Sequence, residues 1–254
     1  MKRELKVLAI GIILCLVFVT YGTCEEIVIG AGQAPMENIL KQVQDSFQRS
    51  TKIQLKMSSC GPKAAFELLE KGAVEVALGG LDFDDWLAFM KVEGAEIKNP
   101  SAYSHTVVGN DRVLVYVNRE NPVTKLSKEQ VKGIFTGQIQ SWKEVGGTDM
   151  PIIIVWTNLL GGNFLFQKNI LDGAAPAKDV LAVNTSADAK AAIAANQEAI
   201  GIGPVSIYDP GMKSVDAPEV PRPITLITKG KPQPKVQSLI DYVVKGDGQK
   251  LVKQ

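Results

Sequence analysis

The chain has 254 residues, of which 45% are hydrophobic and 22% are charged. This composition is ordinary for a globular protein of one or two domains, and a chain of this length buries a core without help from disulfides or metals. The formal net charge is +1, so the chain lacks the global basic field that nucleic-acid binding requires, and nucleic acid is not an expected partner.

The first 24 residues have the layout of a secretory signal. The basic segment MKREL precedes the apolar run VLAIGIILCLVFV, and the small residues Gly22, Thr23 and Cys24 follow. The apolar run is short for a transmembrane helix. We therefore predict a signal peptide at 1–24, cleaved after Cys24, and a mature protein that is periplasmic or otherwise extracytoplasmic. The alternative is a lipoprotein anchored at Cys24, which is less favoured because Thr23 precedes the cysteine where Gly or Ala is usual.

Strands and helices alternate along the rest of the chain. In the first part of the chain the pattern predicts strands at 26–30, 52–57 and 74–80, which alternate with helices at 35–50, from Pro62 to a close at Gly72, and at 83–91. In the middle part it predicts a strand at 112–119, a helix capped by Ser127, a strand at 151–156 and a helix after Gly161–Gly162. In the last part it predicts a helix capped by Thr185 or Ser186, strands at 199–207 and 222–228, and a helix at 234–246. This alternation predicts an α/β fold with largely parallel sheets.

Residues that could perform covalent or metal chemistry are scarce. Once the signal is removed, Cys60 is the single cysteine, and His105 is the single histidine of the whole chain. These two cannot build a thiolate–imidazole metal cluster, and no phosphate-binding P-loop or dinucleotide fingerprint is present. We expect no cofactor, no metal, no catalytic residue and no enzyme activity. Cys60 is either a small buried hydrophobe or a thiol in a binding site.

The segment VWTNLLGGNFLFQKNIL, at 155–171, joins a strand to a helix through the turn Gly161–Gly162. Free backbone N–H groups at the start of such a helix suit an anion. The segment nevertheless carries no arginine or serine, and Thr157 and Lys168 are its only hydroxyl and cationic side chains. It is therefore a working anion site, a site rebuilt for another ligand, or only a turn. Trp156 is expected to pack in the core rather than to stack on a ligand.

The order of motifs resembles the phosphate-type periplasmic binding proteins of ABC importers along nearly the whole mature chain. The resemblance is carried by GAGQAP at 30–35, SSCGPKAAFELLEKG at 58–72, VEVALGGLDF at 74–83, and a long segment at 113–155 in which Asn118, Asn121–Pro122, Leu126, Ile134–Phe135, Gly137 and Trp142 fall on the family pattern. The resemblance implies a type II fold with two α/β lobes, each a mostly parallel sheet flanked by helices, and a ligand cleft between them. Lobe one would comprise 25–116 plus 207–254, and lobe two would comprise 117–206.

The resemblance also implies where a ligand would bind. Phosphate-binding relatives carry Arg-x-x-Gly-Ser-Gly-Thr after the strand at 151–156, whereas here Trp156 or Thr157 replaces the arginine, Leu160 the serine and Gly162 the threonine. The expected ligand-binding residues are Gly32, Gln33, Ala34, Ser58, Ser59, Cys60, Asp82, Thr157, Gly161, Gly162 and Asn163. Asp82 would repel an anion, and would suit a ligand with a cationic or donor group.

The function that this sequence predicts is that of an extracytoplasmic solute-binding protein, similar to the receptors of ABC phosphate importers. Its ligand would be phosphate, another small oxyanion or a small polar molecule, its partner an ABC permease, and its state a monomer. The alternative is a sensory or interaction protein on the same scaffold, with an eroded ligand site, that presents its surface to a membrane sensor.

Overall fold

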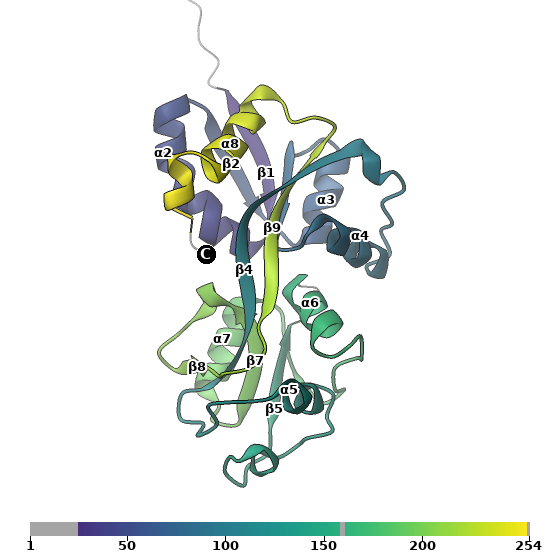
Figure 1. The fold of residues 1–254 in the computed structure, drawn as a ribbon, viewed down its shortest axis with the longest axis vertical. Helices are drawn as coiled ribbons and strands as arrows, with labels where there is room; N and C mark the ends of the chain where they lie inside the picture. The colour runs from purple at the N-terminus through teal and green to yellow at the C-terminus, as the bar shows by residue number, and fades with distance from the viewer. Residues whose placement is uncertain (1–24, 158–160, 253–254) are drawn as a thin grey trace, which may run out of the picture.

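The computed structural model describes residues 25–157 and 161–252. The predicted signal peptide at 1–24, with Cys24, lies outside the described residues, and so does Leu160. The described chain forms two α/β lobes, one above the other in Figure 1, and two long strands run through both of them. The predicted two-lobed α/β fold is thus confirmed.

The first lobe, at the top of Figure 1, is built from the N-terminal part of the chain and the C-terminal helix. Its elements are β1 (Glu26–Ala31), α1 (Gln33–Pro35), a π-helical turn (Met36–Leu40), α2 (Lys41–Thr51), β2 (Gln54–Ser59), α3 (Pro62–Glu70), β3 (Val76–Gly79), α4 (Phe83–Val92) and α8 (Pro234–Val244). The second lobe contains α5 (Lys128–Phe135), β5 (Ile153–Thr157), α6 (Gly161–Asn169), β6 (Leu181–Val183), α7 (Ser186–Ala195), β7 (Ala199–Pro204) and β8 (Met212–Ser214). The strands that run through both lobes are β4 (Tyr103–Asn118) and β9 (Val220–Lys229).

The strands form one continuous sheet in the order β2-β1-β3-β9-β4-β7-β5-β6, and β8 pairs with β4. In the first lobe β1 is parallel to β2 and β3, and in the second lobe β5 is parallel to β6 and β7. Strands β4 and β9 are antiparallel over most of their length. The loops after the parallel strands therefore meet at the carboxyl ends of the strands, which is where open α/β sheets bind ligands.

Apolar periodicity accounts for the cores. In the first lobe the inward positions of β1 pack with one face of α2 and α8, for example Ile27 and Ile29 with Phe47 and Leu239. Trp86 and Trp142 are fully buried in this packing. Trp156 is also buried, and its ring contacts the rings of Phe135 and Phe166, which confirms that it packs in the core.

Most predicted elements are present, with differences at their ends. Ser127 forms the predicted capping box, Thr185 rather than Ser186 caps α7, and Gly72 has the positive φ of 68° expected after a helix. The pattern missed the first half of β4 and the three-residue strands β6 and β8, which are too short for a periodic signal.

The segment after β7 packs with the second lobe. Ile207 and Met212 share a core cluster with Val155 and Ile193, and β8 pairs with the end of β4. We therefore propose that the chain returns to the first lobe within β9, later than the boundary at residue 207 expected from the sequence. Among residues 25–157 and 161–252, no helix is long and apolar enough to cross a membrane.

Candidate functional site

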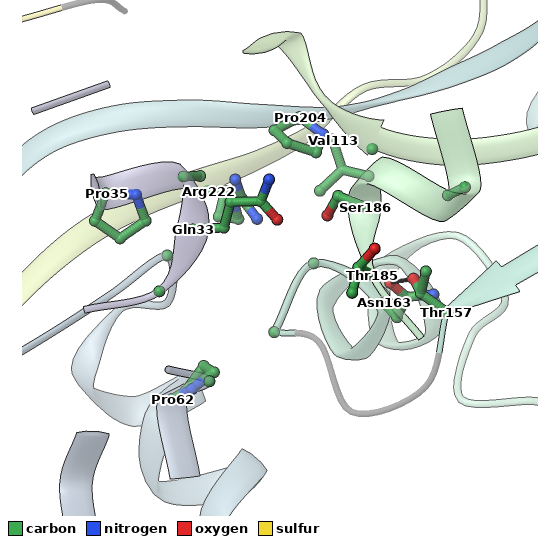
Figure 2. Close-up of a pocket in the computed structure, with 18 of the residues that line it drawn as sticks. Gln33, Pro35, Pro62, Val113, Thr157, Asn163, Thr185, Ser186, Pro204 and Arg222 are labelled. Atoms are coloured by element: carbon green, nitrogen blue, oxygen red, sulfur yellow. Dashed lines mark hydrogen bonds between the residues drawn. The ribbon is translucent and has the colours of Figure 1, made fainter. Parts of the chain in front are cut away.

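A cavity of about 220 Å³ lies between the two lobes. Its walls come mainly from four loops, each joining the carboxyl end of a parallel strand to a helix. Residues of strands β4, β7 and β9 complete them. The lining residues of the loops are 32–35, 59–62, 161–163 and 184–186, and the others are Gly80, Val113, Ala189, 202–204, Arg222 and Thr157. Figure 2 shows Pro35 and Pro62 of the first lobe facing Thr157, Asn163, Thr185 and Ser186 of the second.

The starts of four helices thus surround this cavity. Gly32 precedes the helix that begins with α1 and continues through α2, Gly61 precedes α3, and neither start has a side-chain cap. The start of α7 differs, because the Thr185 hydroxyl accepts a hydrogen bond from the backbone N–H of Asp188. Uncapped helix starts present backbone N–H groups and partial positive charge, so the cavity suits a negatively charged ligand.

Nine of the eleven residues expected to bind ligand line the cavity. They are Gly32, Gln33, Ala34, Ser59, Cys60, Thr157, Gly161, Gly162 and Asn163. The other two are not among the lining residues: the Ser58 hydroxyl donates to the carbonyl of Ile29, and the Asp82 carboxylate caps α4 by accepting from the N–H of Asp85.

Two polar side chains in the second-lobe wall hold each other in a fixed orientation. The Thr157 hydroxyl donates to Oδ1 of Asn163 over 2.9 Å, and both residues are buried. The amide nitrogen Nδ2 of Asn163 is buried without a hydrogen-bond partner. Since Oδ1 already accepts from Thr157, the group of Asn163 left without a partner is its donor.

Arg222, on β9, was not expected to be part of the site. Its side chain is only 10% exposed, and Nη2 donates to Oδ2 of Asp111, which lies directly opposite on β4. Its Nε is buried without a partner. The sequence does hold a signal for this residue, because Arg222 stands at the period-2 position between the apolar residues Val220 and Ile224. In the structure all three are buried, so the arginine occupies an inward-facing position.

Glycines from both lobes make room for the Arg222 side chain. A Cβ added at Gly80, in the first lobe, would lie 2.8 Å from both Cδ and Nε of Arg222. A Cβ added at Gly162, in the second lobe, would lie 3.2 Å from Nη1. The guanidinium group therefore sits in the seam between the lobes, and the view in Figure 2 draws Arg222 between Pro35 of the first lobe and Ser186 of the second.

Cys60 lines the same cavity and is half-buried. Burial raises the pKa of its thiol above the ordinary value, against a smaller opposing effect of the hydrogen bond with the Ala31 backbone. A raised pKa disfavours the thiolate, which is the reactive form. His105 is exposed and stacks on Phe83 with ring centroids 4.2 Å apart. Among the described residues, no group of three or more His, Cys, Asp or Glu side chains could hold a metal ion.

The lobes also touch beside the cavity, through α4 of the first lobe and α6 of the second. Lys168 donates to the nearly buried carboxylate of Asp85, and the pKa of Lys168 is raised, chiefly by this hydrogen bond. The rings of Phe89 and Phe164 meet edge to face with centroids 5.6 Å apart.

Comparison with known proteins agrees with this geometry. The chain is 28% identical over 173 residues to the phosphate-binding protein PstS of Bacillus subtilis (strain 168), a match that covers 67% of this chain and 54% of the relative. The chain therefore spans about half the length of the curated relatives it matches.

Two solved structures share the fold. A putative phosphate ABC transporter substrate-binding protein with bound phosphate from Clostridium perfringens has a TM-score of 0.76 at 20% identity, covering 89% of this chain and 96% of that chain. An ABC-type phosphate transport receptor from Vibrio cholerae has a TM-score of 0.68 at 21% identity, with the same coverage. The family model described as the PBP superfamily domain matches residues 20–247, which is far more than half of the sequence, and the chain therefore belongs to the PBP superfamily.

Proposed function

We propose that this protein is an extracytoplasmic solute receptor that binds a small oxyanion between its lobes and delivers it to an ABC permease. The observation that carries the proposal is the meeting of four helix starts around one cavity. Backbone N–H groups at helix starts favour anions, and closure of the lobes would exclude water from them. The cavity of about 220 Å³ is below the range of about 300–1,000 Å³ that is common for drug-sized ligands, which favours a small solute.

The names of relatives support the transport role. The relatives in Bacillus subtilis and Staphylococcus aureus are called phosphate-binding proteins, and the receptor from Vibrio cholerae is described as part of ABC-type phosphate transport. These relatives carry the names of binding proteins, not of enzymes. For the present chain, phosphate is one candidate among the small oxyanions, because the loop before α6 lacks the arginine expected from the resemblance.

A thermal-shift screen tests the proposal. The mature protein is melted with phosphate, sulfate, molybdate, tungstate and small organic acids, each at the same ionic strength, with chloride as the control. A ligand present at 100 times its Kd stabilises the folded protein by about 2.7 kcal/mol. A specific rise in the melting temperature with at least one oxyanion is expected. If no solute shifts the melting temperature, the receptor role is contradicted, and the sensory or interaction role that pairs the same scaffold with a membrane sensor is favoured.

The proposal includes three further points. The precursor would lose a signal peptide at 1–24, the mature protein would be a monomer, and no lipid would be attached at Cys24. Mass spectrometry of the mature N-terminus and sedimentation analysis of the purified protein test these points. A mature chain that begins with a lipidated cysteine would contradict the first and the third.

A further inference from the structure

Arg222 is the only charged residue among the described residues that line the cavity. Residues 158–160, between β5 and α6, are Asn, Leu and Leu by sequence and add no charge. The expected arginine position at 156–157 holds a buried tryptophan and a threonine. Any charge that the side chains of this wall direct at a ligand therefore has to come from β9, not from the loop before α6.

The Arg222 guanidinium is held in place before a ligand arrives. Asp111 binds Nη2 from the directly opposite position of β4, and the stem of the side chain lies against Gly80. Asp111 is not among the lining residues, and both of its oxygens already accept hydrogen bonds, Oδ2 from Arg222 and Oδ1 from the backbone N–H of Arg112. Nε is buried without a hydrogen-bond partner. Nη1 lies on the side of Gly162, which also lines the cavity.

A second buried donor without a partner belongs to Asn163, which also lines the cavity. Thr157 occupies the oxygen of the Asn163 amide, so that Nδ2 is left as a buried donor without a partner. Arg222 and the Asn163 amide thus contribute donors to the lining, and no carboxylate appears among the described lining residues. Buried donors without partners are costly, and only a group that accepts hydrogen bonds can satisfy them.

We propose that Arg222 is the cation that binds the ligand, and that the cleft selects a fully ionised tetrahedral oxyanion, of the class of sulfate, molybdate and tungstate, over phosphate. This inference rests on the proposed receptor function. Phosphate keeps at least one proton at neutral pH, and its O–H group needs an acceptor that a carboxylate would provide best. A fully ionised oxyanion needs donors alone. Buried sites reject a ligand that leaves polar groups unpaired far more strongly than one that differs only in size.

The same assignment explains the glycine at position 162. The resemblance places a threonine there in phosphate-binding relatives, and any side chain at 162 would begin 3.2 Å from Nη1 of Arg222. The glycine therefore makes room for a guanidinium that arrives from the opposite side of the cavity. Compared with the pattern that the resemblance implies, the cationic group lies on β9 rather than in the loop before α6, and position 162 carries no side chain.

Isothermal titration calorimetry with sulfate, molybdate, tungstate and phosphate, at one ionic strength and neutral pH, tests the proposal. At least one of the three fully ionised anions is expected to bind 10-fold or more tightly than phosphate. Arg222→Gln is expected to weaken that binding by about 100-fold, since two hydrogen bonds from a charged donor are lost. Asp111→Asn is expected to bind the anion as tightly as the wild type or more tightly, because Arg222 no longer shares its charge with a carboxylate.

Two further variants keep the test decisive. Arg222→Gln leaves Asp111 buried without a cation and can unfold the protein, whereas the double variant Asp111→Asn with Arg222→Gln replaces the ion pair with two amides. Circular dichroism identifies the variants that fold, and the folded double variant is expected to show the same 100-fold loss. Arg112→Gln removes an exposed cation that pairs with Glu219, next to Asp111 in the chain, and is expected to leave anion affinity unchanged.

The outcomes separate this inference from the proposed function. If an oxyanion binds and both the Arg222→Gln and the double variant keep wild-type affinity, Arg222 is not the binding cation, although the receptor function stands. If phosphate binds more tightly than the three fully ionised anions, the selectivity is overturned while the receptor function again stands. If no oxyanion binds the wild type, the receptor function itself fails.

Discussion

Gly80→Ala is the most direct test of how Arg222 is packed, and it requires no knowledge of the ligand. The added Cβ would lie 2.8 Å from Cδ and Nε of Arg222 and 3.1 Å from Cγ. These atoms belong to the stem of a side chain whose backbone lies in β9 and whose far end is held by Asp111. The arginine therefore cannot move aside without losing its ion pair.

The expected cost follows from these contacts. Overpacking a buried site costs about 1–3 kcal/mol, and replacing a glycine by alanine where φ is negative returns about 0.4–1 kcal/mol through the unfolded state. Gly80 is not among the glycines with positive φ, so both terms apply. The midpoints of the two ranges give a net destabilisation of about 1.3 kcal/mol, which corresponds to a decrease of about 3–5 °C in melting temperature for a protein of this size.

Gly30→Ala is the matched control. Gly30 also has a φ outside the positive range, and the nearest atoms to its added Cβ, on Ala65 and Cys60, lie at 3.4–3.5 Å, which is ordinary contact. Thermal and urea denaturation followed by circular dichroism compare the two variants. If Gly80→Ala melts at the same temperature as Gly30→Ala, the close packing of Arg222 in the seam is refuted.

Three further predictions concern the same region. Lys168→Met removes the ion pair with Asp85 that joins α4 and α6, and should destabilise the protein by about 1 kcal/mol or less and raise the radius of gyration in small-angle scattering. Iodoacetamide should modify Cys60 more slowly than free glutathione at neutral pH, because burial raises the thiol pKa, and mass spectrometry measures the rate. The pKa of Tyr116 is raised to about 12, chiefly by burial, so the folded state favours the neutral phenol. The resulting stabilisation is complete below about pH 10, the pKa in the unfolded chain, and is lost as the pH rises through about 12. Ultraviolet titration of tyrosinate should show this raised pKa.

Each of these predictions has a control and a contradicting result. Lys125→Met breaks a well-exposed pair within the second lobe and should leave the radius of gyration unchanged; an equal change in both variants would count against a lobe contact at Lys168. Cys60→Ser should abolish alkylation of the mature chain, and a wild-type rate at or above that of glutathione would contradict the buried thiol. Tyr116→Phe should remove the titration near pH 12, and its persistence in that variant would assign it to another tyrosine.

The sequence predicted the parts of this fold that local chemistry encodes. Apolar runs marked the second half of β4 and the central part of β9, and a serine followed three positions later by a glutamine marked the start of α5. The short strands β6 and β8 were not predicted, because three residues cannot display a period. The family resemblance also pointed to the cavity wall, since nine of the eleven residues that it implied line the cavity.

The position of the positive charge in the site could not be predicted from local sequence patterns. Arg222 lies in a run that reads as a buried strand, and Asp111, its partner, is 111 residues away in the chain. The two are brought together by the register of β4 with β9, and the room for the guanidinium comes from Gly80 in one lobe and Gly162 in the other. By itself, the sequence determined the fold, the cleft and the loss of charge from the loop before α6. Only the tertiary structure decided where the positive charge lies, because a side chain can enter a shared cavity from any strand that reaches it, and that placement depends on strand register and packing rather than on neighbouring residues.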